Sequence, residues 1–208
     1  MNFRDFSRER DLHTLSHRHL TNVLIPGWLK KHSTELDWRI ESSAYGETPE
    51  AVFSRLLDGL SPADSLLDLG AGAGNLIAQC LSRGVPCWGI EQNRDLVEEG
   101  HRFLQSLEMP PGNLIWGDFL TLEWPAARVA FAASSRFSGE TLRLLVERLG
   151  ENATVEKVLT LGRRLEPGGN WVLSREEVIA VRWNPSEPAL KENLCCWERR
   201  SERPTPQT

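Results

Sequence analysis

The feature that most constrains the fold is a short apolar stretch, residues 65–69, that runs directly into a glycine-rich loop. The loop joins an acid to three alternating glycines and reads Asp68-Leu69-Gly70-Ala71-Gly72-Ala73-Gly74. A buried strand that turns through glycines into a helix is typical of parallel α/β sheets, where bare backbone lets a ligand come close. The sequence therefore predicts a bound ligand at the end of this strand.

Strand-like and helix-like stretches alternate around this loop. The predicted strands are 65–69, 86–91, 113–116 and 128–133, and the predicted helices between them are 75–82 and 94–106. Such alternation indicates a doubly wound, mostly parallel sheet with helices on both of its faces.

The rest of the chain continues this pattern and then changes it. We predict two helices at 139–149 and 155–165 and a fifth strand at 170–174. Two last strands are predicted at 178–183 and 194–199. Because only a proline-containing loop separates the last two strands, they should pair antiparallel. The expected fold is α/β, a seven-stranded Rossmann-like sheet that ends in an antiparallel hairpin.

Helical segments are also expected before the sheet, over 2–20, 28–32 and 50–60. The first two fall in an N-terminal helical extension, residues 1–42. A length of 208 residues suits one domain with a proper core, which we assign to 43–200. The last segment, 201–208, carries two prolines and is expected to be frayed.

Composition narrows the class of protein. Apolar residues make up 40% of the chain, yet no stretch approaches the roughly 18 apolar residues of a membrane span, so no membrane partner is expected. The first 20 residues are highly charged and do not resemble a secretory signal, which favours a cytoplasmic protein. A net charge of −5 disfavours autonomous nucleic-acid binding, because neutralising phosphates supplies most of that affinity. The four cysteines lack zinc-site spacing and are expected to be buried thiols.

Acids at the ends of successive strands indicate which ligand the loop serves. Glu91 ends the second strand, where a carboxylate can accept both hydroxyls of a ribose. Asp118 follows the third strand as an acceptor for an adenine amino group, and Phe119 offers a ring for stacking. Asp68 would repel a pyrophosphate but suits the ammonium end of a methionine, and Asn75 replaces the third glycine of the dinucleotide fingerprint. The combination predicts an S-adenosylmethionine pocket, and so methyl transfer.

Five segments in a fixed order carry a resemblance to a known family. They are Tyr45-Gly46-Glu47-Thr48, Asp68 to Gly74, Ile90-Glu91, Gly117-Asp118-Phe119-Leu120 with Glu123-Trp124, and Val129 to Glu140. Together they resemble the Dot-one family, the non-SET histone lysine methyltransferases named for disruption of telomeric silencing. The similarity spans residues 43–174.

This resemblance implies a class I methyltransferase fold with S-adenosyl-L-methionine as its cofactor. In that family the first of the five segments closes over the methionine end of the cofactor. By resemblance Tyr45, Glu47 and Thr48 become cofactor contacts here, beside the glycine loop. The alternative for Thr48 is a simple helix cap before the helix at 50–60.

The acceptor half of the pattern departs from the family. Where the family shows paired asparagines and a phenylalanine lining a lysine channel, this chain has Ala133-Ser134-Ser135-Arg136. Ser134, Ser135 and Arg136 are therefore the candidates to contact the methyl acceptor, with Glu140 as an alternative ion-pair partner for Arg136. A basic nucleosome-binding tail is also missing from this sequence.

Three functions stay open at this point. The first is a methyltransferase with a Dot-one-like cofactor pocket that acts on a protein lysine or another amine. The second is methyl transfer to a small molecule, favoured by the altered serine segment and the acidic composition. The third is a non-catalytic module that only holds the cofactor. The identity of the acceptor does not follow from these residues.

Overall fold

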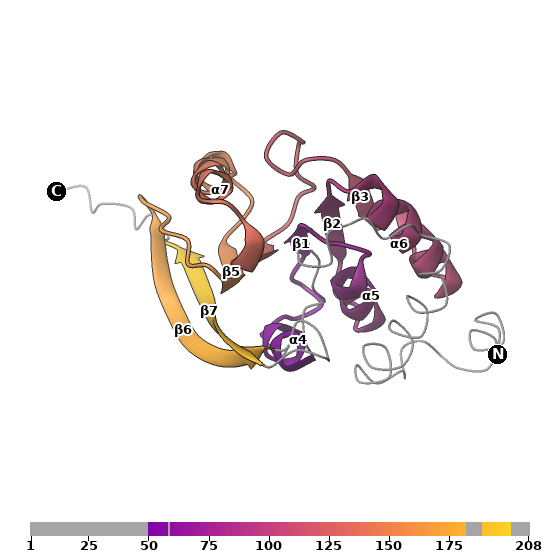
Figure 1. Ribbon diagram of the computed structural model, residues 1–208, viewed down its shortest axis with the longest axis horizontal. Coiled ribbons are helices and arrows are strands. Elements are labelled where there is room, and N and C mark those ends of the chain that lie inside the picture. The colour runs from indigo at the N-terminus through magenta and orange to yellow at the C-terminus, as the bar shows by residue number, and fades with distance from the viewer. Residues whose placement is uncertain (1–49, 58, 182–188, 201–208) are drawn as a thin grey trace.

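The computed structural model describes residues 50–57, 59–181 and 189–200. Within these ranges helices pack on both faces of one seven-stranded sheet (Figure 1). The helices and strands in chain order are α4 (Glu50–Leu57), β1 (Leu66–Leu69), α5 (Asn75–Ser82), β2 (Cys87–Glu91), α6 (Arg94–Ser106), β3 (Leu114–Trp116), β4 (Val129–Ala133), α7 (Gly139–Glu151), β5 (Lys157–Gly162), β6 (Trp171–Val181) and β7 (Leu190–Arg199). Two short 3-10 turns, η3 (Pro111–Asn113) and η4 (Ser134–Arg136), precede β3 and follow β4.

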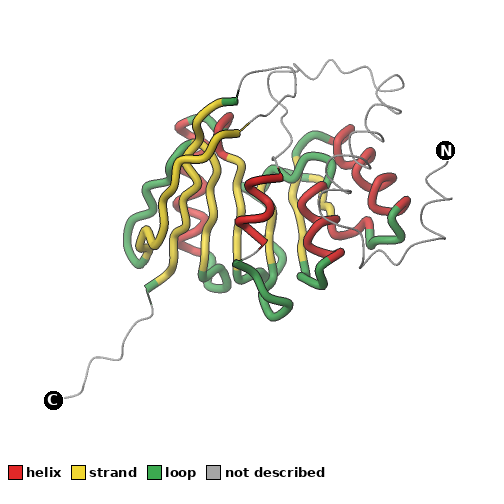
Figure 2. Tube along the Cα trace, turned by 90° about the horizontal axis from the view of Figure 1, so that it is seen from below, coloured by secondary structure: helices red, strands yellow, loops and turns green. Residues whose placement is uncertain are grey.

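The strands lie in the order β3-β2-β1-β4-β5-β7-β6. All neighbours from β3 to β5 pair parallel, whereas β7 pairs antiparallel with both β5 and β6. Figure 2 shows these strands side by side, with the long β6–β7 hairpin at one end of the sheet. The predicted fold class, a doubly wound sheet that ends in an antiparallel hairpin, is therefore confirmed.

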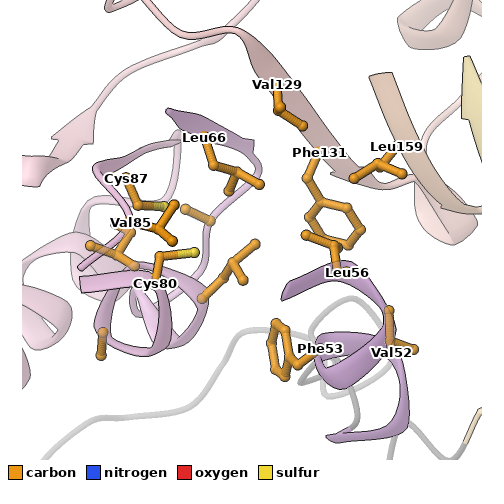
Figure 3. Packing of buried hydrophobic residues seen from close by; sticks show 14 of the residues in the cluster. Val52, Phe53, Leu56, Leu66, Cys80, Val85, Cys87, Val129, Phe131 and Leu159 are labelled. Carbon is orange, nitrogen blue, oxygen red and sulfur yellow. The ribbon is translucent and has the colours of Figure 1, made fainter. Parts of the chain in front are cut away.

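Two apolar layers hold the helices to the sheet, because side chains along each strand alternate between its faces. On β4, Val129 and Phe131 join the layer under α4, α5 and α6, while Ala130 and Ala132 join the layer under α7. The first layer is shown in Figure 3, where Leu56 of α4 lies next to Phe131. Figure 1 shows α7 on the other side of the sheet from α4 and α5.

Four cysteines contribute to these layers, and all of them are buried and free of disulfide bonds, as predicted. Burial is the main reason why the pKa of Cys87 lies well above its ordinary value, and the neighbouring Cys80 thiol and the charge of Asp68 add to it. The thiol of Cys87 therefore stays neutral in the core and packs as a small apolar group.

One predicted helix is wrong. Residues 155–165 were expected to be helical, but 157–162 form β5, a central strand buried on both faces. A strand of this kind has an unbroken apolar run instead of an alternating one, so periodicity cannot separate it from a buried helix. Gly162, with a φ of 105°, ends the strand in a conformation that favours glycine.

The strands expected at 170–174 and 178–183 are one strand, β6, as far as the described residues extend. The pairing with β7 shifts by one residue between Leu173 and Arg175, which marks a β-bulge at Ser174. The polar run after the bulge, residues 175–177, belongs to neither predicted strand. It lies instead on an edge strand, where charged side chains and bulges protect against pairing with other chains.

Most other predicted elements match the structure to within a residue or two, but the strand expected over 194–199 begins four residues earlier, as β7 from Leu190. The helix expected over 50–60 is observed as α4 up to Leu57. The predicted extension 1–42, the loop with Tyr45, Glu47 and Thr48, and the tail 201–208 lie outside the described residues. Among the described helices, none has the length and apolar character needed to cross a membrane.

Candidate functional site

The predicted site residues that fall within the described ranges lie at one edge of the sheet. Parallel strands point their carboxyl ends the same way, and β3, β2, β1 and β4 are consecutive neighbours. In the pairing register Asp68 lies opposite both Gly89 and Phe131, and Glu91 lies opposite Trp116. The strand order also reverses between β1 and β4, which is where ligands bind in open α/β sheets.

The glycine loop crosses this edge in a conformation that side chains would resist. Gly70, Gly72 and Gly74 have φ values of 86°, 54° and 80°, all in the left-handed region. The backbone N–H groups of Gly70 and Ala71 both donate to the carbonyl of Ile90, over 2.9 and 3.1 Å. The loop is thereby tied to β2 and leads into α5 at Gly74, an N-cap residue that has no side chain to bond the first N–H groups of the helix.

Two predicted polar residues flank the loop and are nearly fully buried. Asp68, the third residue of β1, is 5% exposed, and Asn75, the first residue of α5, is 7% exposed. The Oδ1 atom of Asn75 accepts a hydrogen bond of 2.6 Å from Nε2 of Gln79, one turn later on α5. Asn75 thus stabilises the first turn of α5 under the glycine loop.

Glu91 occupies the centre of the edge and is held by backbone donors. Its Oε2 atom accepts from the N–H of Gly72 over 3.0 Å, and its Oε1 atom accepts from the N–H of Asn93 over 2.8 Å. The side chain of Asn93 in turn accepts from two N–H groups in the first turn of α6, which caps that helix. The carboxylate of Glu91 therefore has a fixed orientation between the loop and α6.

The segment after β3 brings an acid and an aromatic pair to the same edge. Asp118 accepts a hydrogen bond of 2.8 Å from the N–H of Leu120, which folds the segment back on itself. The ring of Phe119 stacks on that of Phe137, with centroids 5.4 Å apart and planes inclined by 27°. Phe137 also approaches Gly70, since a Cβ on that glycine would lie 3.6 Å from the ring. The aromatic pair thus joins the ends of β1, β3 and β4.

The serines after β4 form part of η4 and face β5. Ser134 is fully buried, and its hydroxyl lies 3.1 Å from the carbonyl of Leu161 and 2.7 Å from that of Arg163. Ser135 makes a longer contact of 3.5 Å to the same Leu161 carbonyl. Both serines therefore bind the end of β4 to the end of β5.

Arg136, the last residue of η4, has an exposed side chain. The alternative partner considered for it, Glu140, instead forms an ion pair with Arg143. The hydrogen bond from Arg143 is the main reason why the pKa of Glu140 lies below its ordinary value. Arg136 thus remains the member of the serine-arginine segment that extends into solvent.

Sequence reasoning missed how Glu91 is supported. Asn93 was not singled out, although an asparagine just before a helical stretch is a recognisable N-cap. The contribution of the Gly72 N–H could not be read from residue types, because it depends on how the loop folds against β2. Phe137 lies within the Val129 to Glu140 segment of the family resemblance but has no predicted role there, and its contact with Phe119 links two separate segments of the chain.

No protein-family model and no curated protein matches the chain. Solved structures match it in fold. An RNA methyltransferase from Salinibacter ruber, in complex with S-adenosyl-L-homocysteine, has a TM-score of 0.56 and 20% identity, over 76% of this chain and 96% of its own. A candidate class I S-adenosylmethionine-dependent methyltransferase from Listeria monocytogenes has a TM-score of 0.62 and 12% identity, over 97% of this chain and 74% of its own. A candidate tRNA methyltransferase from Streptococcus pneumoniae has a TM-score of 0.54 and 15% identity, over 77% of this chain and 74% of its own.

The chain has the class I methyltransferase fold. At these identities the likeness establishes the fold, and the activity has to be argued from the residues at the edge of the sheet. The resemblance to the Dot-one family gains no match from these comparisons and stays a prediction.

Proposed function

We propose that the protein is a methyltransferase that uses S-adenosyl-L-methionine, bound along the carboxyl edge of β1, β2 and β3. The observation that carries this proposal is the fixed carboxylate of Glu91. An ionised carboxylate offers about four acceptor sites and no donor, and backbone N–H groups use one site on each oxygen. The capacity left on the two oxygens matches the two hydroxyl donors of a ribose.

The neighbouring residues fit the other parts of such a cofactor. The exposed Gly70 leaves backbone without a side chain at the end of β1, where the methionine portion would pass. Asp68, buried beside the loop, supplies the negative charge that an α-ammonium group needs. Asp118 would accept from the adenine amino group, with Phe119 beside the ring.

Bound S-adenosylmethionine would supply a methyl group already activated on a sulfonium. The task left to this chain is to align an acceptor in line with that methyl group and to exclude water, so a strong general base is not required. The buried Ser134 would act by holding the end of β4 in position, and the exposed Arg136 would contact the acceptor. Tyr45, Glu47 and Thr48 complete the proposal as contacts to the methionine end, by their resemblance to the Dot-one family.

The class of acceptor is the finer part of the proposal. The Dot-one resemblance favours a protein lysine or another amine, whereas the change to Ala133-Ser134-Ser135 favours a small molecule. The matching proteins from Salinibacter ruber and Streptococcus pneumoniae carry names that specify RNA and tRNA, so RNA belongs among the acceptors to be tested.

Calorimetric titration with S-adenosylhomocysteine tests cofactor binding directly. The wild-type protein should bind, and Glu91→Ala should weaken binding at least tenfold, since hydrogen bonds to a charged group are worth about 1.5–3 kcal/mol. Glu98→Ala is the matched control, because Glu98 is an exposed acid on α6 that pairs with Arg94. Absence of binding, or equal affinities for Glu91→Ala and Glu98→Ala, would contradict the proposal.

Cofactor carrying a radiolabelled methyl group, incubated with fractionated lysate, separates the acceptor classes. Label in protein supports the lysine hypothesis, label in RNA supports the nucleic-acid hypothesis, and label in the low-mass fraction supports a small molecule. Cofactor binding without label in any fraction would favour the third hypothesis, a module that holds the cofactor without turnover.

A further inference from the structure

Trp116 is an exposed aromatic residue held in a fixed position at the edge of the candidate site. It is the last residue of β3, and 57% of its surface is exposed. Its indole Nε1–H donates a hydrogen bond of 3.1 Å to the carbonyl of Gln92. The guanidinium group of Arg94 lies over the ring, 5.4 Å from its centroid. The ring is therefore oriented by two contacts, although solvent reaches much of it.

The position of Trp116 relates it to the two groups assigned to adenosine. Trp116 is the pairing partner of Glu91 in the parallel register of β2 and β3, so both side chains leave the same face of the sheet. Asp118 follows Trp116 by two residues. The indole thus lies one strand beyond the carboxylate proposed for the ribose, and next to the segment proposed for the adenine amino group.

The charges nearby indicate which ring system suits this surface. Glu91 and Asp118 are acids, and the cation over the indole, Arg94, already pairs with Glu98 over 3.0 Å. These two acids would repel the phosphates of a nucleic-acid backbone, whereas they would not repel an uncharged heteroaromatic ring. The ring of Phe119, expected from the sequence to face adenine, has one neighbour already in Phe137.

We propose that Trp116 forms the outer aromatic wall of the adenine pocket. This inference rests on the proposed function, because it places the adenosine half of the same cofactor. Stacking of a base on an aromatic side chain is worth about 1–3 kcal/mol, which corresponds to about a 5- to 150-fold change in affinity. The contact favours a purine ring over smaller substituents and so contributes to cofactor specificity.

The test compares the affinity of S-adenosylhomocysteine for the full-length wild-type protein, Trp116→Ala and Trp116→Phe. Trp116→Ala should bind 5- to 150-fold more weakly, and Trp116→Phe should recover most of the loss because it keeps an aromatic face. Val178→Ala is the control, since Val178 is 61% exposed on β6, at the other end of the sheet. Circular dichroism melts establish that each variant is folded.

Tryptophan fluorescence gives a second readout that a merely structural role would not change. Binding of S-adenosylhomocysteine should alter the emission of the wild-type protein, and most of that change should be absent in Trp116→Phe. If Glu91→Ala weakens binding while Trp116→Ala binds as tightly as wild type, the inference is overturned and the proposed function stands. If the wild-type protein does not bind at all, the proposed function itself fails.

Discussion

The backbone N–H of Gly72 donates a hydrogen bond of 3.0 Å to Oε2 of Glu91, so the loop after β1 and the end of β2 hold each other in place. The other carboxylate oxygen accepts from the N–H of Asn93 over 2.8 Å. Both oxygens are therefore oriented before any ligand arrives. Such pre-organisation lowers the entropic cost of binding, because fewer groups have to be ordered when the ligand enters.

Glu91→Gln should reduce both stability and ligand affinity. An amide in place of the carboxylate turns an NH₂ group toward one of two backbone N–H donors, which leaves a buried donor without an acceptor. We expect the free energy of unfolding to fall by about 1–3 kcal/mol in urea titrations. Glu98→Gln, an exposed change on α6, should stay within about 0.5 kcal/mol of wild type. Equal unfolding midpoints for the two variants would contradict this account of the carboxylate.

Gly100→Ala should destabilise the protein, although alanine is normally the better helix former by about 1 kcal/mol. A Cβ on Gly100 would lie 2.3 Å from a methyl group of Leu114 and 2.8 Å from the carbonyl oxygen of Ala73, so α6 could not pack as it does. The expected loss is about 1–3 kcal/mol, measured by denaturant unfolding. Gly112→Ala is the control, because a Cβ at that position meets nothing within 4 Å. A stabilised Gly100→Ala variant would refute the packing argument.

Arg199→Met should loosen the attachment of α7. The guanidinium group donates to the carbonyls of Leu149, Asn152 and Val155 over 3.0, 2.6 and 3.0 Å, and it lies 4.6 Å from the ring centroid of Trp171. Methionine keeps the length of the side chain but leaves these carbonyls without their donor, at a cost of about 2–3 kcal/mol.

Arg143→Met is the comparison for that measurement. Its ion pairs with Glu140 and Glu147 are solvent-exposed, and water and salt screen such pairs, so they contribute little to stability. Thermal melts should therefore rank Arg199→Met clearly below Arg143→Met. Equal melting temperatures would show that the contacts at the end of α7 contribute little.

Asp64 should lose its contribution to stability in acid. The backbone N–H and the hydroxyl of Ser61 both donate to its carboxylate over 2.8 Å, and these hydrogen bonds hold the pKa of Asp64 below its ordinary value. Because the pKa is lower in the folded than in the unfolded chain, the stabilisation is present above about pH 3.9 and is lost as the pH falls through the folded pKa.

Ser61→Ala isolates the hydroxyl in that interaction. The pKa of Asp64, followed by carboxyl NMR, should move upward toward its ordinary value in Ser61→Ala, and Ser61→Thr should retain the low value. The dependence of stability on pH below about pH 4 should become shallower in the alanine variant for the same reason. An unchanged Asp64 titration in Ser61→Ala would contradict the assignment.

Ser134→Ala should affect folding more than it affects the acceptor site. The hydroxyl is fully buried and serves the carbonyls of Leu161 and Arg163, so its removal should cost about 1–2 kcal/mol of unfolding free energy. Arg136→Ala, at an exposed position two residues later, should leave the unfolding free energy within about 0.5 kcal/mol. If Ser134→Ala melts like wild type, the hydroxyl does not hold β4 to β5, and the result would favour direct contact of Ser134 with the methyl acceptor.

Local pattern was sufficient for most of the elements. Apolar runs, glycines and caps near β1, α5, β2 and α6 act over a few residues, so their boundaries follow from the sequence to within one residue. The local sequence pattern gave the wrong element at β5, because a strand covered on both faces has the same apolar run as a buried helix. Only its position between β4 and β7 makes an extended conformation the one that satisfies its backbone hydrogen bonds.

The sequence by itself determined which residue types reach the carboxyl edge, because Asp68, Glu91 and Asp118 each stand at or near the end of a predicted strand. Tertiary structure alone decided what those residues can do there. The orientation of Glu91 comes from backbone N–H groups of Gly72 and Asn93, and every residue except proline carries such a group whatever its side chain. Whether a backbone donor points at a carboxylate depends on the path of the chain in space, which no residue type encodes.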